Sequence, residues 1–363
     1  MFSLKPDYAQ TRERIEAFWH NDVLDRPVIN MPIPLPPAEQ VPLPAAHHPD
    51  PAGRWTDAQY NAELALASLS NQAFLGDTLP IAFPNLGPEI FSAFYGCPIH
   101  FGDYGTSWTD PILEDWGQKL AFDWNSPWLA KLEEMTDALL EISKGKFITG
   151  MTDWHPGADA IAAFRDPQKL AMDLLTNRED VLALLDQISQ DYFKIYDIYY
   201  TKLRAAGMPI TSWTPLVSEG KYYIPSNDFS IMISRAMFNE FFLPGIIAEC
   251  RFLDRSIYHL DGPGALRHLD ALLAIPELNA VQWVFGAGNE GFGRWVDVYR
   301  KIQAAGKGIQ VICELSELEA IMQTLSPRGM FLSMSGVPDR ESGEAVLKAL
   351  RDWTAAWRKG NPA

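Results

Sequence analysis

Cysteine, basic residues and long apolar runs are all scarce in this chain. Its 363 residues include three cysteines, Cys97, Cys250 and Cys313, whose odd number and wide spacing exclude a disulfide framework and a CxxC zinc site. Lysine and arginine number 30 against 46 acids, a net charge of −16, which disfavours nucleic acid and anionic membrane surfaces as partners. No stretch reaches the roughly 18 apolar residues of a membrane span. We therefore expect no nucleic-acid partner and no membrane span.

Two motifs of common enzymes are also missing. Neither a P-loop lysine motif nor a Gly-x-Ser-x-Gly motif occurs, which weakens ATP-dependent and serine-hydrolase functions. The first residues lack the basic and then apolar pattern of a signal peptide. With 47% hydrophobic and 21% charged residues, the chain is able to bury a core. We expect a globular cytoplasmic protein, a monomer or a homodimer, that acts on a small molecule.

Short apolar or β-branched segments alternate with stretches of helical period, a pattern typical of a parallel sheet covered by helices. Eight strands are expected, over 27–32, 80–85, 147–153, 209–213, 256–261, 280–285, 309–314 and 330–335. Helices are expected over 266–273, 293–305, 317–325 and 340–357. Eight strands alternating with helices in a chain of this length predict an α/β fold, a (β/α)8 TIM-type barrel.

The barrel is expected to be one domain over 1–363, with an N-terminal helix and proline-rich loop within 1–79. Residues 27–51 contain nine of the 27 prolines. Because proline neither donates to a β-ladder nor continues a helix, we expect a long irregular loop after the first strand. Such a loop either covers the mouth of the barrel, where barrel enzymes build their sites, or is a surface excursion without a role.

The ends of the expected strands carry polar side chains. Residues His259 and Asp261 stand at i and i+2 of one strand, so their side chains project to the same side. The turn after them, which begins at Gly262, permits a close backbone approach to a ligand. The pair is suited to acid–base catalysis, metal binding or clamping a polar substrate, and the alternative is a structural hydrogen bond.

Further acids and imidazoles follow other strands. Asp153 and His155 repeat the i, i+2 spacing and are expected to form a second polar side of the cleft, unless Asp153 caps the next helix. Glu219 is a candidate acid or base, although a loop glutamate is more often solvated. Our expected catalytic set is therefore His259, Asp261, Asp153, His155 and Glu219.

Aromatic and neutral polar side chains near the expected strand ends suit a mouth that stacks on a ring or a sugar. Asp228 precedes a helical stretch and either faces the cleft or caps that helix. The residues expected to bind substrate are Trp213, Asp228, Tyr258, Gln282, Trp283, Trp108 and Ser335.

Five segments carry a family resemblance. They read Leu-Asp-Arg-Pro-Val-Ile at 24–29, Gly-Met-Thr-Asp-Trp-His-Pro-Gly at 150–157, Asn-Asp-Phe-Ser-Ile-Met-Ile-Ser-Arg-Ala-Met-Phe-Asn-Glu-Phe-Phe-Leu-Pro at 227–244, Ser-Ile-Tyr-His-Leu-Asp-Gly-Pro-Gly at 256–264 and Met-Phe-Leu-Ser-Met-Ser-Gly-Val-Pro at 330–338. Together they resemble the uroporphyrinogen decarboxylase superfamily, in the methyltransferase-like branch that includes corrinoid-dependent methyltransferases. The resemblance implies a (β/α)8 barrel.

The resemblance also implies a zinc site, although this chain lacks some of the ligands found in the methyltransferases. In the methyltransferases a His-x-Cys pair and a later cysteine bind zinc, which activates a thiol that receives the methyl group. In this chain His259 matches the histidine of the pair. Asp261 occupies the position of the first cysteine, and the position of the second cysteine lies near Ser335. Both thiolates are absent, so thiol activation is in doubt, while a harder site on His259 and Asp261 remains, with Cys313 as a possible substitute ligand. The decarboxylase's arginine-bearing opening motif has no match.

Three functions follow from these observations. The first is a demethylase-type methyltransferase that moves a methyl group from a small O- or N-methylated substrate, such as a methoxyaromatic, to a corrinoid carried by a partner protein. The second is a lyase or other acid–base enzyme on a small carboxylate or sugar, which would need no corrinoid. The third is a non-catalytic protein that binds a ligand without converting it. Zinc content and the requirement for corrinoid distinguish them.

Overall fold

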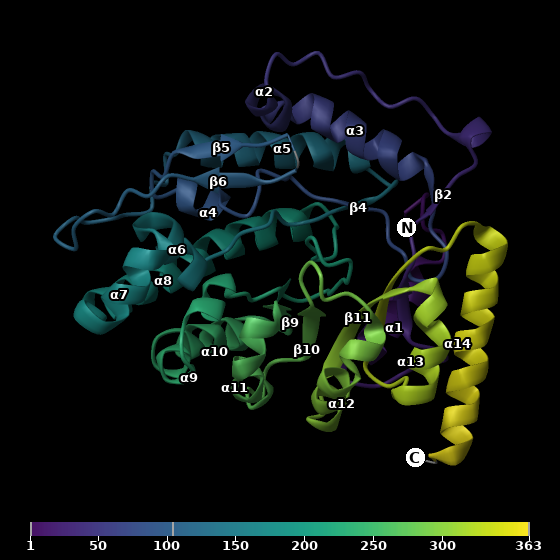
Figure 1. The fold of residues 1–363 in the computed structure, drawn as a ribbon. Helices are drawn as coiled ribbons and strands as arrows, with labels where there is room; N and C mark the ends of the chain where they lie inside the picture. Colours follow the sequence, from purple (N-terminus) through teal and green to yellow (C-terminus); the bar gives the residue numbers. More distant parts are fainter. Residues whose placement is uncertain (1, 104, 362–363) are drawn as a thin grey trace.

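The computed structural model describes residues 2–103 and 105–361 (Figure 1). Its N-terminal third contains short strands joined by long connections. The elements in this part are α1 Tyr8–Trp19, β1 Val28–Asn30, β2 Ile33–Pro34, the 3-10 turn η1 Pro37–Glu39, α2 Pro51–Thr56, α3 Ala58–Ser70, β3 Gln72–Ala73, β4 Ile81–Ala82, α4 Ile90–Ala93, β5 Ile99–Phe101 and β6 Ser107–Thr109.

The middle third is mainly helical. Its elements are α5 Pro127–Ser143, β7 Ile148–Thr149, α6 Ala158–Arg165, α7 Pro167–Thr176, α8 Arg178–Ala205, β8 Tyr222–Tyr223, the 3-10 turn η2 Asp228–Met232, α9 Arg235–Met237, the π-turn η3 Phe238–Phe242 and α10 Leu243–Phe252.

The last third alternates strands with helices. Its elements are β9 Arg255–Asp261, η4 Pro263–His268, α11 Leu269–Leu273, β10 Ala280–Val284, η5 Phe292–Arg294, α12 Val296–Ala304, β11 Gly308–Glu314, η6 Leu315–Glu317, α13 Leu318–Thr324, β12 Met330–Ser335 and α14 Arg340–Gly360.

Six strands form one parallel sheet in the order β1-β12-β11-β10-β9-β8. Helices α12, α13 and α14 lie outside these strands in Figure 1. Central strands of such a sheet are covered on both faces, and accordingly Ile309 and Val311 of β11 are fully buried. Helix α14 begins where the Asp339 carboxylate accepts the backbone N–H of Ser342 at 2.8 Å. The predicted α/β class with parallel strands is confirmed.

Between β1 and β8 the curve of the sheet is continued by isolated contacts. Strands β4 and β7 form a separate parallel pair. Asp77 joins β1 to the segment before β4, because its backbone N–H donates to the Ile29 carbonyl at 3.0 Å and its carboxylate accepts the Ile29 N–H at 3.1 Å. Met151, just after β7, donates to the Thr211 carbonyl at 2.7 Å. Over the described ranges the expected complete ring of eight paired strands is thus not formed.

Seven of the eight expected strands contain a strand in the structure. The exception is 209–213, where Pro209 has no N–H and Ile210 pairs only through an isolated antiparallel bridge with Ser218. On the side of β9 that faces away from β10, the neighbouring strand is β8 in place of the strand expected over 209–213. Tyr222 and Tyr223 of β8 are fully buried. The four expected helices are present as α11 with η4, α12, α13 and α14.

The proline-rich stretch after β1 is irregular, as predicted, apart from β2 and the short turn η1. In Figure 1 it runs from β2 along the edge of the molecule to α2. Helix α3 then packs on α5, and Ala62, Leu69 and Leu139 share a small core between them. Across the described residues, none of the helices combines the length and apolarity of a membrane span.

Candidate functional site

The candidate site forms where the end of β9 meets the segment after β8. Ser226 and His259 form a parallel bridge, and the His259 N–H donates to the Pro225 carbonyl at 2.9 Å. This pairing continues the sheet by a few residues and brings Asp228 beside the end of β9, which carries Asp261. Because parallel strands all end at the same edge, side chains from separate segments converge there.

Asp228, His259 and Asp261 form a group with the composition of a metal site. One ligand atom of each lies within 4.8 Å of those of the others, and His259 Nε2 is 3.9 Å from Asp228 Oδ1. One imidazole and two carboxylates suit zinc or a similar divalent cation, with positions left for water or substrate. The sequence predicted His259 and Asp261 as ligands, and the fold adds Asp228.

The His259 ring is held in the orientation that metal binding requires. Gln282 on β10 lies opposite His259 in the sheet register, and its Oε1 accepts a hydrogen bond from Nδ1 at 2.5 Å. Nδ1 therefore carries a proton, and Nε2 is the ring nitrogen that faces Asp228. The Trp213 ring packs nearly perpendicular to the His259 ring, with 5.2 Å between the two centroids. Such a fixed tautomer is typical of metal-binding histidines, so the residues present fit a divalent cation.

His155 lies among three carboxylates. Its Nε2 is 3.3 Å from Asp153 Oδ1 and its Nδ1 is 3.8 Å from Asp159 Oδ2, while Asp228 completes the group. Burial alone would lower the pKa of His155, but Asp153, Asp159 and Asp228 together raise it to about 10. With no metal bound, the imidazole is therefore protonated at neutral pH and supplies the positive charge on this side of the site.

Asp159, at the start of α6, holds the segment that carries Asp228. Its carboxylate accepts the backbone N–H groups of Asp228 at 3.2 Å and Phe229 at 3.0 Å. N–H groups at the beginning of a helical turn have no acceptor within the turn itself, so Asp159 acts as a capping residue that another helix supplies. Neither Asp153 nor Asp228 makes a side-chain capping bond. The sequence offered no signal for Asp159, because its partner lies about 70 residues away.

A pocket of about 510 Å³ opens beside this cluster. Asp228, His155 and Asp159 form part of its lining, and so does Trp108. Its rim is apolar, because Trp108, Ile231 and Met232 are 49%, 50% and 48% exposed. Within the described chain the lining includes neither lysine nor arginine. The pocket is therefore suited to a molecule with an apolar body, and it lacks an anchor for a carboxylate apart from His155.

Glu89 is a further lining residue of the same pocket, at the residue before α4. Its carboxylate accepts a hydrogen bond from Ser92 Oγ at 3.3 Å. Burial, together with the negative charges of Asp159 and Asp228, raises the pKa of Glu89 to about 7 against the opposing effect of His155. A carboxyl group that titrates near neutral pH in a pocket is suited to donating or accepting a proton. Sequence reasoning missed it because nothing local marks its burial.

Glu219 and Cys313 lie apart from the metal-competent group. Glu219 is half-exposed and forms ion pairs with Arg204 at 2.8 Å and Arg12 at 3.6 Å. Cys313 belongs to β11, which β10 separates from β9, and burial raises the pKa of its thiol to about 12. A thiol with so high a pKa is a poor metal ligand at neutral pH. The structure therefore places neither residue where the sequence expected it.

Three residues expected to bind substrate have structural contacts instead. Tyr258 and Trp283 are buried in the core, Trp283 against Trp295 at 5.0 Å between ring centroids. Ser335 Oγ donates to Glu314 Oε1 at 2.8 Å. Gln282 and Trp213 contact His259 rather than the pocket, whereas Trp108 and Asp228 line it.

The glycines after β10 have the Gly-x-Gly-x-x-Gly spacing of a dinucleotide-binding turn, at Gly286, Gly288 and Gly291. The turn is satisfied internally, since the Gly288 N–H donates to Glu290 Oε1 at 2.8 Å. Helix α12 begins only at Val296, after a separate 3-10 turn. No helix N-terminus therefore follows the last glycine, which that type of phosphate binding requires.

The chain matches no family model and no curated protein sequence. Among solved structures it is similar to a methyltransferase from Methanosarcina mazei, with a TM-score of 0.58 and 12% identity. The match covers 94% of this chain and 98% of that chain. At this identity the likeness shows a shared α/β fold and nothing further. The predicted relation to the uroporphyrinogen decarboxylase superfamily stays a prediction.

Proposed function

We propose that this chain is a demethylase-type methyltransferase on a (β/α)8-type barrel. It would take a methyl group from a small O- or N-methylated donor, such as a methoxyaromatic, and pass it to a reduced corrinoid carried by a partner protein. One observation carries the proposal: Asp228 belongs both to the metal-competent group and to the lining of a pocket with an apolar rim. The shared fold with a methyltransferase supports it.

The metal-competent group, Asp228, His259 and Asp261, would hold a zinc ion. When bound there, zinc supplies Lewis-acid chemistry toward the methylated heteroatom. Gln282 keeps His259 in the required tautomer, and Trp213 limits the movement of the ring. Since both thiolates of the zinc-binding methyltransferases are absent, the carboxylates Asp228 and Asp261 supply the negative charge that balances the ion.

The pocket residues would bind the donor and supply a proton. The rim residues Trp108, Ile231 and Met232 pack against the apolar body of the donor. When the methyl group leaves with the character of CH3+, the heteroatom keeps the bonding electron pair and needs a proton. Glu89 is placed to donate it, because its pKa of about 7 keeps a substantial fraction protonated at neutral pH.

A lyase acting by acid–base catalysis is the second candidate, and Glu89 is the observation that favours it. The absence of lysine and arginine from the described pocket lining argues against a small carboxylate as its substrate. Turnover without corrinoid would distinguish this function from methyl transfer.

The test combines metal analysis with an anaerobic methyl-transfer assay. Wild-type protein, His259→Ala and the control His20→Ala, an exposed histidine at the end of α1, are assayed with methoxyaromatics and methylamines and with cobalamin reduced to Co(I). We expect about one zinc per chain and corrinoid methylation in wild type and in the control, and neither in His259→Ala. Zinc-loaded wild type that methylates no corrinoid over this panel would contradict the proposal.

A further inference from the structure

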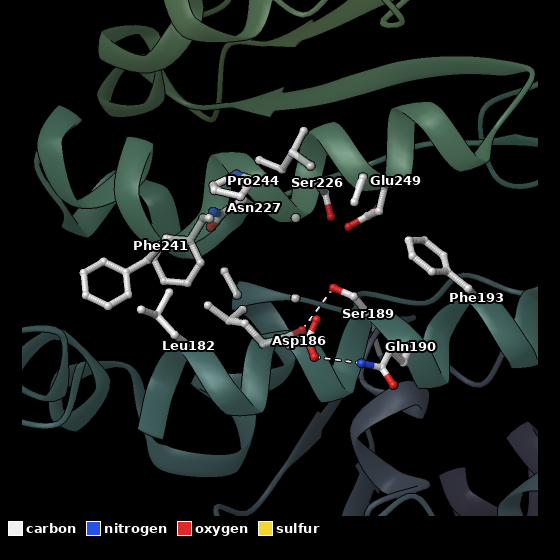
Figure 2. Close-up of a pocket in the computed structure, with 17 residues that line it drawn as sticks. Leu182, Asp186, Ser189, Gln190, Phe193, Ser226, Asn227, Phe241, Pro244 and Glu249 are labelled. Atoms are coloured by element: carbon white, nitrogen blue, oxygen red, sulfur yellow. Dashed lines mark hydrogen bonds between the residues drawn. The ribbon is translucent and has the colours of Figure 1, made fainter. Parts of the chain in front are cut away.

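A second cavity lies between α8 and α10 (Figure 2). Its volume is about 270 Å³, smaller than the pockets of drug-sized ligands. Residues 157–158 and 226–227 line it as well, so it adjoins the turn that carries Asp228 without including any residue of the metal-competent group. The site proposed above makes no use of this cavity.

Two polar side chains in the cavity have no partner. Asn227 is 4% exposed, and neither its amide nitrogen nor its amide oxygen makes a hydrogen bond. Glu249 is 7% exposed, and its carboxyl group makes no hydrogen bond or ion pair with any residue that the structure describes. Leaving a buried polar group unsatisfied costs free energy, so the Asn227 amide indicates a missing partner, and Glu249 adds a carboxyl group without a hydrogen bond to the same cavity.

The charge of the lining selects the kind of partner. Asp186 of α8 and Glu249 of α10 both line the cavity, and the described lining contains no lysine, arginine or histidine. Burial and the nearby charge of Asp159 raise the pKa of Glu249 to about 8, although His155 acts in the opposite direction. An anion would find no counter-charge here, whereas a cation would stabilise the Glu249 carboxylate.

The remaining lining is apolar and partly aromatic. Phe193 of α8 and Phe241 and Phe242 of η3 contribute ring surfaces, with Leu182 and Leu185 beside them. The other polar groups from α8 are already engaged: Gln190 donates to Asp186 at 2.7 Å, and Ser189 donates to the Leu185 carbonyl at 3.0 Å. Asp186 is exposed and keeps its second carboxylate oxygen free, whereas the buried side-chain acceptors in the described lining that make no hydrogen bond are the carboxyl group of Glu249 and the amide oxygen of Asn227.

We propose that this cavity is a binding site for a small organic ammonium ion. Its ammonium group donates hydrogen bonds to Glu249 and to the amide oxygen of Asn227, and its hydrocarbon part lies against the leucine and phenylalanine side chains. Phenylalanine rings also attract cations, which adds to the selectivity for charge. The proposal is independent of methyl transfer, because it uses none of the residues assigned to that reaction.

Calorimetric titration of the full-length protein tests it with three probes of similar size: n-butylammonium, n-butanol and n-butyrate. The titration is made at about pH 8.5, where most of Glu249 is ionised and an alkylammonium group, like lysine, keeps its proton. We expect saturable binding of one n-butylammonium per chain and at least tenfold weaker binding of the other two. Equal binding of n-butanol, or no binding of n-butylammonium, would overturn the proposal without the use of any variant.

Two variants locate the site. Glu249→Gln keeps the shape of the side chain and removes its charge, so we expect at least a tenfold loss of n-butylammonium affinity. Glu319→Gln, an exposed glutamate on α13, is the matched control and should bind as wild type does. Binding that is unchanged in folded Glu249→Gln would place the ammonium ion elsewhere and refute the assignment. Asn227→Ala is expected to weaken binding to a smaller degree, because it removes one neutral acceptor.

Discussion

Gln282 on β10 accepts a hydrogen bond at 2.5 Å from Nδ1 of His259, its register partner on β9. This contact decides which ring nitrogen of His259 is available for a metal. It also explains why a glutamine is buried in the middle of a parallel sheet, where a carboxamide without a partner would be destabilising.

Gln282→Leu should therefore weaken zinc binding without removing a ligand. Loss of the partner that orients a metal-binding histidine typically costs about 10- to 100-fold in affinity. The dissociation constant is measured by competition with a chromophoric chelator. Gln310→Leu is the matched control, since Gln310 is also buried in the sheet but donates to Ser333 Oγ at 2.8 Å. Equal losses in both variants would show a general effect on the sheet.

Glu89→Gln tests the proton donor. We expect turnover to fall by about 10²- to 10⁴-fold, the usual contribution of a general acid. In wild type the protonated form is the active one, so turnover should decline as pH rises through about 7, the pKa of Glu89. The variant should lack this decline. A pH profile that is identical in wild type and variant would exclude Glu89 from proton transfer.

Trp108→Ala should raise KM and leave kcat close to wild type, because in the proposed function the exposed ring packs against the body of the substrate at the rim and not against the reacting atoms. About a tenfold rise is expected for the loss of one aromatic contact of roughly 1.4 kcal/mol. Trp124→Ala is the control, as Trp124 is 42% exposed but lines a different surface pocket. A fall in kcat alone would show that Trp108 acts differently.

Asp77→Asn should destabilise the fold strongly. The Asp77 carboxylate is fully buried, pairs with the buried Arg26 and accepts the Ile29 N–H, so it connects β1 to the chain before β4. Breaking such a buried pair costs about 3–5 kcal/mol. Urea unfolding measures this, with Asp25→Asn as the control. Asp25 is 40% exposed in its pair with Arg14, and its loss should cost at most about 1 kcal/mol.

Glu249 should make stability depend on pH. Its pKa is about 8 in the folded chain, above the ordinary value of 4.5 of an exposed glutamate. Between these values the unfolded chain has released a proton that the folded chain keeps, so stability decreases as pH rises, by up to about 1.4 kcal/mol per pH unit. Urea unfolding of Glu249→Gln between pH 5 and about 9 should show a shallower decrease than wild type. If the free energy of unfolding changed with pH in the same way in wild type and in Glu249→Gln, the raised pKa of buried Glu249 would be contradicted.

Sequence patterns alone determined the alternation of strands and helices in the last third of the chain. Apolar segments such as the one ending at Cys313, and amphipathic segments such as the one after Asp339, have local periods that follow directly from strand and helix geometry. The spacing of His259 and Asp261 likewise placed both on one side of a strand. These features could be predicted because each depends on residues within a few positions of one another.

Tertiary structure decided what the site contains. Asp228 joins His259 through a bridge between segments about 30 residues apart, and Asp159 holds Asp228 from about 70 residues away. The raised pKa of Glu89 and the isolation of Glu249 both result from burial, which no local pattern encodes. The sequence placed Glu219 in the expected catalytic set, yet it is paired with two arginines at the surface. Charge, burial and partner are properties of the packed chain, because they depend on which distant side chains exclude water from each carboxyl group.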